Sequence, residues 1–176
     1  MSDLNADLES LLHSAYRYAT ALTAHAETAE DLVHEGWLKV LDKYGPTPDK
    51  PLLFRVIRNL YIDDIRHKTR FPSDQFDEVS HKDTNSIDPS LYVSHDVVLA
   101  EGLTRLRSIE REVLFLWVFE GHTAAEIAAL SNQSRGTVLS QIHRAKAKLK
   151  RHLDKDSDMQ LAVVNAKPGK KGDATP

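Results

Sequence analysis

Apolar residues recur every three or four positions along most of this chain, and that spacing is the feature that most restricts its fold. Residues three and four apart lie on one face of an α-helix, so each such stripe predicts a helix with one buried side. The first stripe consists of Leu8, Leu11, Leu12, Ala15, Tyr16, Ala19 and Leu22. No segment favours a strand, and no internal repeat is evident. The spacing therefore predicts an all-α fold.

Three helices are expected in residues 1–70. Residues 28–44 form the second stripe, and Thr28 is expected to be its N-cap, with Asp31 three positions on as in a capping box. The sequence GPTPDKP at residues 45–51 cannot continue a helix, so it predicts a loop before a third helix that starts near Leu53. These three helices are predicted to form one small helical bundle.

Residues 71–94 differ in composition from the helical segments on either side. Between residues 71 and 91 the chain is polar and interrupted by proline, with five acidic residues against the single Lys82. Such a composition cannot bury enough apolar surface to fold, so a flexible acidic linker is expected there. From residue 154 the helical pattern fades into a tail, 154–176, that is expected to be disordered.

Residues 95–153 are predicted to form a second, four-helix domain that ends in a helix-turn-helix. Thr123 and Glu126 have the spacing of a capping box, and the sequence SNQS at 131–134 predicts a tight turn with Ser134 as the next N-cap. Two short helices joined by a compact polar turn, the second of them longer and basic, are typical of a helix-turn-helix. The buried stripe of the last helix is expected to be Val138, Ile142, Ala145 and Leu149.

Charge is distributed unevenly along the chain, whose net charge is −3 over 176 residues. Residues 1–103 have 10 Lys and Arg against 18 Asp and Glu, whereas residues 104–153 have 9 against 4. A local basic excess favours contact with a polyanion. Composition alone is weak evidence for such contact, because a charge cluster is usually just a solvated face.

Two basic helical surfaces are candidates for nucleic-acid contact. On the last helix, the outward side flanking the buried stripe offers groups that can reach base edges or phosphates. The best candidates there are Arg135, Thr137, Ser140, His143 and Arg144. On the helix after residues 45–51, the basic side includes Arg55, Arg58, Asn59 and Arg66, and an ordinary salt-bridged surface is the alternative for that helix.

Three segments together resemble an extracytoplasmic-function sigma factor of bacterial RNA polymerase. They read TAEDLVHEGWLKVL, PLLFRVIRNLYIDDIRHK and TAAEIAALSNQSRGTVLSQIHRAKAKL, and the resemblance covers roughly residues 8–153 in the order of the family. It implies an alternative sigma factor that binds core polymerase, recognises the minus-ten and minus-thirty-five promoter elements and aids promoter melting. Residues 1–70 would then correspond to region 2 and residues 95–153 to region 4.

The resemblance also assigns roles to particular residues. The acidic, partly apolar face of the second helix would dock on the basic coiled coil of the largest polymerase subunit, through Asp31, His34, Glu35 and Leu38. The minus-ten contacts would come from Asp49, Lys50, Arg55, Arg58, Asn59 and Arg66. The residues already named on the last helix would read the minus-thirty-five element. Leu139 stands where the family commonly has a basic residue, so one fewer DNA contact is expected.

The partners that the resemblance implies are core polymerase, including the flap of its second subunit, promoter DNA, and an anti-sigma factor or other regulator. No cofactor, metal site or membrane insertion is expected, and the location is expected to be cytoplasmic. The chain has no cysteine, which excludes disulfides and thiolate metal sites. Its nine histidines form no ligand-spaced cluster and it has no Gly-rich phosphate loop, which argues against an enzyme. The main alternative is a helix-turn-helix regulator with an unrelated N-terminal domain, which would bind duplex DNA without polymerase.

Overall fold

The computed structural model describes residues 2–45, 49–70 and 102–165, and every regular element in this part of the chain is a helix. The helices are α1 (Ser2–Thr23), α2 (Ala26–Tyr44), α3 (Lys50–Arg70), α5 (Ser108–Val118), α6 (Ala124–Ser131) and α7 (Arg135–Asn165). A short helical stretch at residues 102–104 precedes α5. The all-α prediction is therefore confirmed, with two helical modules, α1–α3 and α5–α7. The predicted linker and the end of the predicted tail, residues 166–176, lie outside the described residues.

The first module is a bundle in which α1 packs against both α2 and α3, and α2 packs against α3. Ala24 connects α1 to α2 with a left-handed backbone conformation, φ 61°. Gly36 allows α2 to approach α3 closely, because a Cβ atom at this position would lie 2.9 Å from Cγ1 of Ile57. At the core of the module the rings of Tyr18 and Phe54 are stacked, with their centroids 4.3 Å apart.

The second module contains the predicted helix-turn-helix, formed by α6 and α7. Thr123 caps α6 as predicted: its hydroxyl accepts a hydrogen bond from the Glu126 N–H, and the Glu126 carboxylate accepts one from the Thr123 N–H. Asn132 ends α6 in the left-handed conformation, φ 53°. The Ser134 hydroxyl then accepts a bond from the Thr137 N–H, so the prediction that Ser134 caps α7 is also confirmed.

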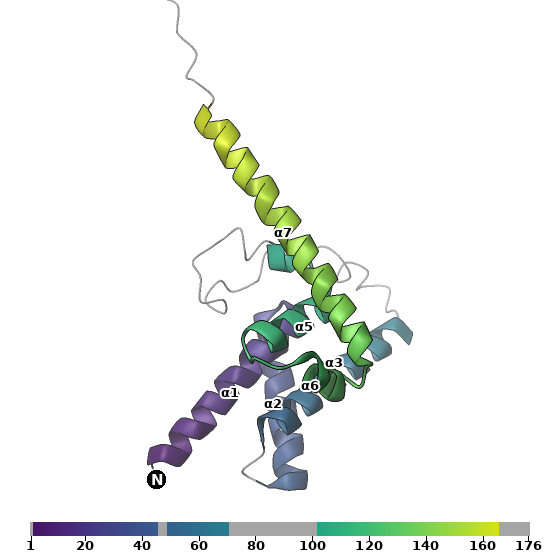
Figure 1. Cartoon of the computed structure of the whole chain (residues 1–176). Helices are drawn as coiled ribbons and strands as arrows, with labels where there is room; N and C mark the ends of the chain where they lie inside the picture. The colour runs from purple at the N-terminus through teal and green to yellow at the C-terminus, as the bar shows by residue number, and fades with distance from the viewer. Residues whose placement is uncertain (1, 46–48, 71–101, 166–176) are drawn as a thin grey trace, which may run out of the picture.

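The two modules share one continuous hydrophobic core. The largest cluster of buried apolar residues combines Tyr18, Phe54 and Ile57 of the first module with Phe115 and Leu116 of α5. It continues into α6 and α7 through Ile127 and Val138. Figure 1 shows α5 lying against α1, and α6 lying near α3. The charged groups of each module must therefore be considered together with those of the other.

Two helix boundaries differ from the sequence-based predictions. Residue Thr28 is not the N-cap of α2, because the helix already begins at Ala26 and the extended residue His25 precedes it. Ala26 and Glu27 have high helix propensity, so the helix can begin two residues before Thr28. Helix α7 runs to Asn165, beyond the predicted end at residue 153, because no proline or glycine interrupts the chain before Pro168. None of the described helices is long and apolar enough to cross a membrane.

Candidate nucleic-acid interface

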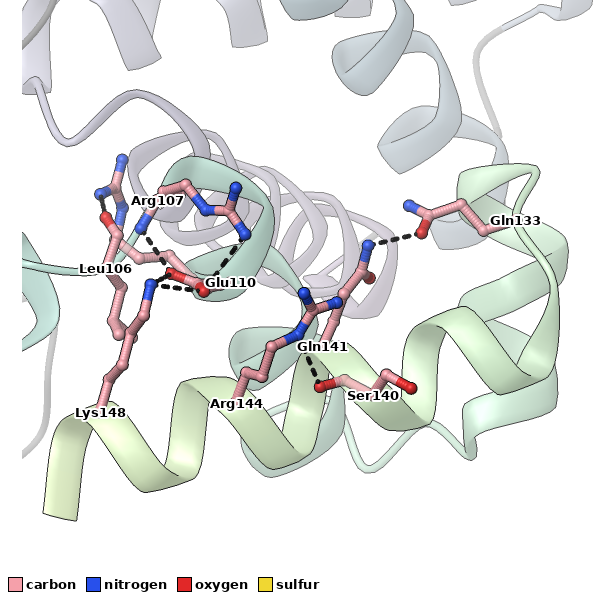
Figure 2. Close-up of polar contacts among 9 residues, drawn as sticks. Leu106, Arg107, Glu110, Gln133, Ser140, Gln141, Arg144 and Lys148 are labelled. Carbon is pink, nitrogen blue, oxygen red and sulfur yellow. Dashed lines mark hydrogen bonds and ion pairs between the residues drawn. The ribbon is translucent and has the colours of Figure 1, made fainter.

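Helix α7 buries one side in the core and exposes the side that is predicted to read DNA. Val138 and Ala145 are fully buried and Ile142 nearly so, as the stripe predicts, whereas Leu149 is only partly buried. The predicted readers are all exposed: Arg135, Thr137, Ser140, His143 and Arg144. Figure 2 shows the Arg144 side chain running back along α7, where its Nε donates a 3.2 Å hydrogen bond to the carbonyl oxygen of Ser140. Its Nη atoms remain available at the surface for an anionic partner.

Polar contacts fix α7 relative to the elements before it. The Gln141 side-chain amide donates a 2.8 Å bond to the side-chain oxygen of Gln133, which joins α7 to the turn (Figure 2). Farther along, Lys148 donates bonds of 2.7 and 2.8 Å to the two carboxylate oxygens of Glu110 on α5. These contacts leave little freedom for α7 to rotate about its axis, which keeps its exposed face directed outward.

Glu110 is ionised although it is only 1% exposed. Burial by itself disfavours the charged form, but the bonds from Lys148 and from the Arg107 N–H at 3.0 Å outweigh it and lower the pKa of Glu110. The exposed Glu126 also has a lowered pKa, chiefly because its carboxylate accepts the Thr123 N–H. Both carboxylates therefore act as structural anions of the second module.

The acidic face of α2 is exposed as predicted. Asp31, His34 and Glu35 lie on the surface, and Leu38 is 51% exposed. Glu35 forms a 2.8 Å ion pair with Lys39 one turn further on, with both side chains more than half exposed. A pair in such a solvated position is weak, so Glu35 can exchange Lys39 for a cation of another molecule at small cost.

The predicted minus-ten residues on α3 are in very different environments. Arg55, Asn59 and Arg66 are exposed. Asp49 is exposed too, but one of its carboxylate oxygens caps α3 by accepting a 3.0 Å bond from the Leu52 N–H. Lys50 is partly exposed and forms an ion pair with Glu120 of the second module.

Arg58 is the exception, because it is buried rather than directed to solvent. Its Nε donates a 2.8 Å bond to Oε1 of Glu112 on α5, and the two side chains are 11% and 3% exposed. The Tyr18 hydroxyl donates to the same oxygen at 2.7 Å. Burial raises the pKa of Glu112, while the charge of Arg58 opposes that rise. Burial also raises the pKa of Tyr18, and the neighbouring carboxylate adds to the effect.

Sequence reasoning missed this network between the modules, including a second buried cation on α5. Arg111 donates hydrogen bonds to the carbonyl oxygens of Ala21 at 2.9 Å and Leu22 at 3.1 Å, at the C-terminal end of α1. A cation is favourable there because the helix dipole is negative at that end. The one signal in the sequence is the run of three charged residues, Glu110 to Glu112, just before the apolar segment VLFLWV.

Within the described residues, no group of three or more His, Asp or Glu side chains is arranged to hold a metal ion. The exposed charged surfaces of α2 and α7 consist of solvated side chains on helices. Such surfaces are suited to contact with other macromolecules.

Comparisons with protein families match both modules. The model of Sigma-70 region 2 matches residues 8–71, and the model of Sigma-70, region 4 matches residues 97–149. The chain is 30% identical over 152 residues to the ECF RNA polymerase sigma factor EcfG of Rhodopseudomonas palustris, which covers 83% of this chain and 82% of that protein. It is 32% identical over 154 residues to the ECF RNA polymerase sigma factor SigE of Mycolicibacterium smegmatis, covering 81% of this chain and 58% of that one.

A solved structure with a similar fold is that of the sigma factor RpoE from Bartonella quintana, in complex with the anti-sigma factor NepR. The TM-score is 0.66 at 26% sequence identity, and the match covers 88% of this chain and 98% of that one.

Proposed function

This chain belongs to the extracytoplasmic-function sigma factors of bacterial RNA polymerase, which direct promoter-specific initiation of transcription, and we propose how its residues divide that work. Residues 1–70 bind core polymerase and recognise and melt the minus-ten element. Residues 95–153 bind the minus-thirty-five element, and residues 71–94 connect the two.

The exposed face of α7 is the observation that carries this proposal. Its buried stripe holds the helix in the core, so that the candidate readers from Arg135 to Arg144 all face solvent. Arginine and histidine side chains donate hydrogen bonds to guanine or phosphate. Serine and threonine hydroxyls form hydrogen bonds with bases or with phosphates. This face is suited to the major groove.

The exposed face of α2 supports polymerase binding at a separate place. It combines the acidic side chains Asp31 and Glu35 with His34 and the apolar Leu38. Carboxylates steer the surface toward a basic partner, and an exposed leucine contributes apolar contact area once it is covered. The docking partner is the coiled coil of the largest polymerase subunit, and the flap of the second subunit contacts the second module.

On α3 and at the residue just before it, the minus-ten contacts are assigned to Asp49, Lys50, Arg55, Arg58, Asn59 and Arg66. Basic side chains along one helix can contact successive phosphates of an opened strand. Polar side chains near the start of the helix contact a base. Two of these residues, Lys50 and Arg58, are paired with glutamates of the second module, and these pairs must open before the cations can contact DNA.

The protein acts by binding rather than by catalysis, and it acts in the cytoplasm with the polymerase. An anti-sigma factor is its regulator, by analogy with the complex of RpoE and NepR. A helix-turn-helix regulator that works without polymerase is the competing function. The acidic face of α2 argues against it, because such a regulator has no use for that surface.

In vitro transcription with core enzyme tests the proposal. Leu38→Glu should abolish co-elution with core polymerase, whereas Arg144→Ala should preserve co-elution and abolish promoter-specific transcripts. Lys150→Ala, which removes an exposed cation of α7 outside the predicted readers, is the matched control and should transcribe normally. Promoter binding by the protein alone, with no association with core, would identify the competing function instead.

A further inference from the structure

Two cations predicted to contact the minus-ten strand are neutralised by carboxylates of the other module. Lys50 is paired with Glu120, just after α5, and Arg58 is paired with Glu112 inside α5. The side chains of both glutamates are less than a tenth exposed. Each glutamate thus places a negative oxygen against a group that would otherwise be free to bind a phosphate.

The pair of Arg58 and Glu112 resembles the contacts of a bound phosphate oxygen. One carboxylate oxygen of Glu112 accepts bonds from the guanidinium of Arg58 and from the Tyr18 hydroxyl, at 2.8 and 2.7 Å. Charge-assisted bonds of this kind are strong, and both donor side chains are buried, Tyr18 fully and Arg58 with 9% exposed. A DNA strand therefore cannot reach Arg58 until α5 has moved away.

The remaining basic face of α3 is also adjacent to the second module. Arg58, Asn59 and Arg66 line a cavity of about 500 Å³ together with Ser131 and Asn132, at the end of α6. Figure 1 shows how α6 lies beside α3 in this arrangement. The end of α6 thus borders one side of the surface that is assigned to the opened minus-ten strand.

We infer that Glu112 and Glu120 act as an intramolecular competitor of DNA phosphate, so that in the free protein the second module masks the minus-ten surface of the first. This inference rests on the proposed function, because it takes Lys50 and Arg58 to be DNA contacts. Binding of DNA by α3 is coupled to separation of the modules, and single-stranded DNA binds only the separated state. If one molecule in ten is separated, the apparent affinity falls about tenfold.

The test compares charge-neutralised variants of the full chain with a matched control. The main variant is Glu112→Gln with Glu120→Gln, which preserves side-chain shape while removing both competing charges. The control is Glu9→Gln with Glu27→Gln, which changes the net charge equally at two exposed residues of α1 and α2. Glu120→Gln alone is the reserve variant in case the buried substitution impairs folding, because its partner Lys50 is 38% exposed.

Two measurements are made on the free protein. The first is the affinity for a fluorescent single-stranded oligonucleotide containing a minus-ten sequence. The second is energy transfer between dyes on cysteines introduced at the exposed positions Glu30 and Lys150, which is straightforward because the chain has no cysteine of its own. Adding Arg58→Ala to the main variant shows whether any gain in affinity depends on the unmasked cation.

The double variant should bind the oligonucleotide about five- to tenfold more tightly, with reduced energy transfer, whereas the control should change by less than about twofold. Arg58→Ala should abolish most of the gain. Equal affinities for the double variant and the control would overturn the inference, as would a gain that survives Arg58→Ala.

Transcription with core polymerase separates this outcome from failure of the proposed function. If the wild type initiates at promoters but the double variant gains no affinity for the oligonucleotide, only the masking is wrong. If neither protein supports initiation with core enzyme, the proposed function itself is wrong.

Discussion

Glu110 shows how a single buried charge can hold the helix-turn-helix in place. Its carboxylate accepts two bonds from Lys148 and one from the Arg107 N–H, so it links α5 to α7 and also caps α5. Glutamine in its place retains the size of the side chain but not the charge. Because hydrogen bonds to charged groups contribute about 1.5–3 kcal/mol, and Lys148 is partly exposed, we expect Glu110→Gln to cost about 1–2 kcal/mol at pH 7.

The pH dependence of that cost has a definite sign. The folded-state pKa of Glu110 is lowered, so the stabilisation is fully present above the ordinary glutamate pKa of about 4.3 and is lost as the pH falls through the lowered value. Urea unfolding of wild type and Glu110→Gln at several pH values should therefore converge in acid. Glu9→Gln, an exposed control, should follow the wild type throughout. A difference that is constant with pH would contradict the role assigned to the Glu110 charge.

At single positions, the sequence correctly predicted whether a side chain is buried or exposed where the periodicity of one helix alone determines it. The periodicity of α7 correctly separates the buried Val138 and Ala145 from the exposed Ser140 and Arg144. Arg58 was predicted to face DNA by the same reasoning, yet it is buried against Glu112. A helical wheel contains no information about a partner 54 residues away, so this pairing could not be predicted from periodicity.

Helix ends were less predictable than helix faces, and the two threonines that were predicted to be caps illustrate why. Thr123 and Thr28 both precede acidic residues at capping-box spacing, but only Thr123 caps a helix, because α2 begins before Thr28. We expect Thr123→Ala to destabilise the protein by about 1 kcal/mol through loss of the cap. Thr28→Ala, the matched control, should change stability little or raise it slightly, because alanine is the better helix former. Comparable losses in thermal unfolding for the two variants would place the start of α2 at Thr28 after all.

The exposed apolar residue on the reading face of α7 leads to a second prediction for that element. Leu139 is 45% exposed among the candidate DNA contacts. Arginine there should add one phosphate contact, so the slope of log affinity against log salt should steepen by about 0.9 for duplex minus-thirty-five DNA. Ser10→Arg adds the same charge at an exposed position of α1 and is the control. If both variants gave the same slope, the added charge would be acting nonspecifically rather than through α7.

At the scale of the whole molecule, the sequence correctly predicted two helical modules but not that they share a core. The helices themselves follow from local periodicity, whereas the packing of Tyr18 and Phe54 with Phe115 joins residues that are far apart in the chain. Since α1 packs against α5 as well as against its own neighbours, each module completes the burial of the other. A folded chain of this kind should lose both modules together.

The two tryptophans allow this cooperativity to be measured, because Trp37 lies in α2 and Trp117 in α5. In the variants Trp117→Phe and Trp37→Phe, the remaining tryptophan reports the unfolding of a single module. In each variant, we expect the fluorescence of the remaining tryptophan to give the same urea midpoint as circular dichroism, because the shared core couples the modules. Adding Arg111→Ala to each variant removes the bonds to the carbonyl groups of Ala21 and Leu22 and should separate the two midpoints, with loss of α5 preceding loss of α2. Fluorescence and circular dichroism midpoints that already differ before Arg111 is replaced would mean that the modules fold independently and that their common core contributes little.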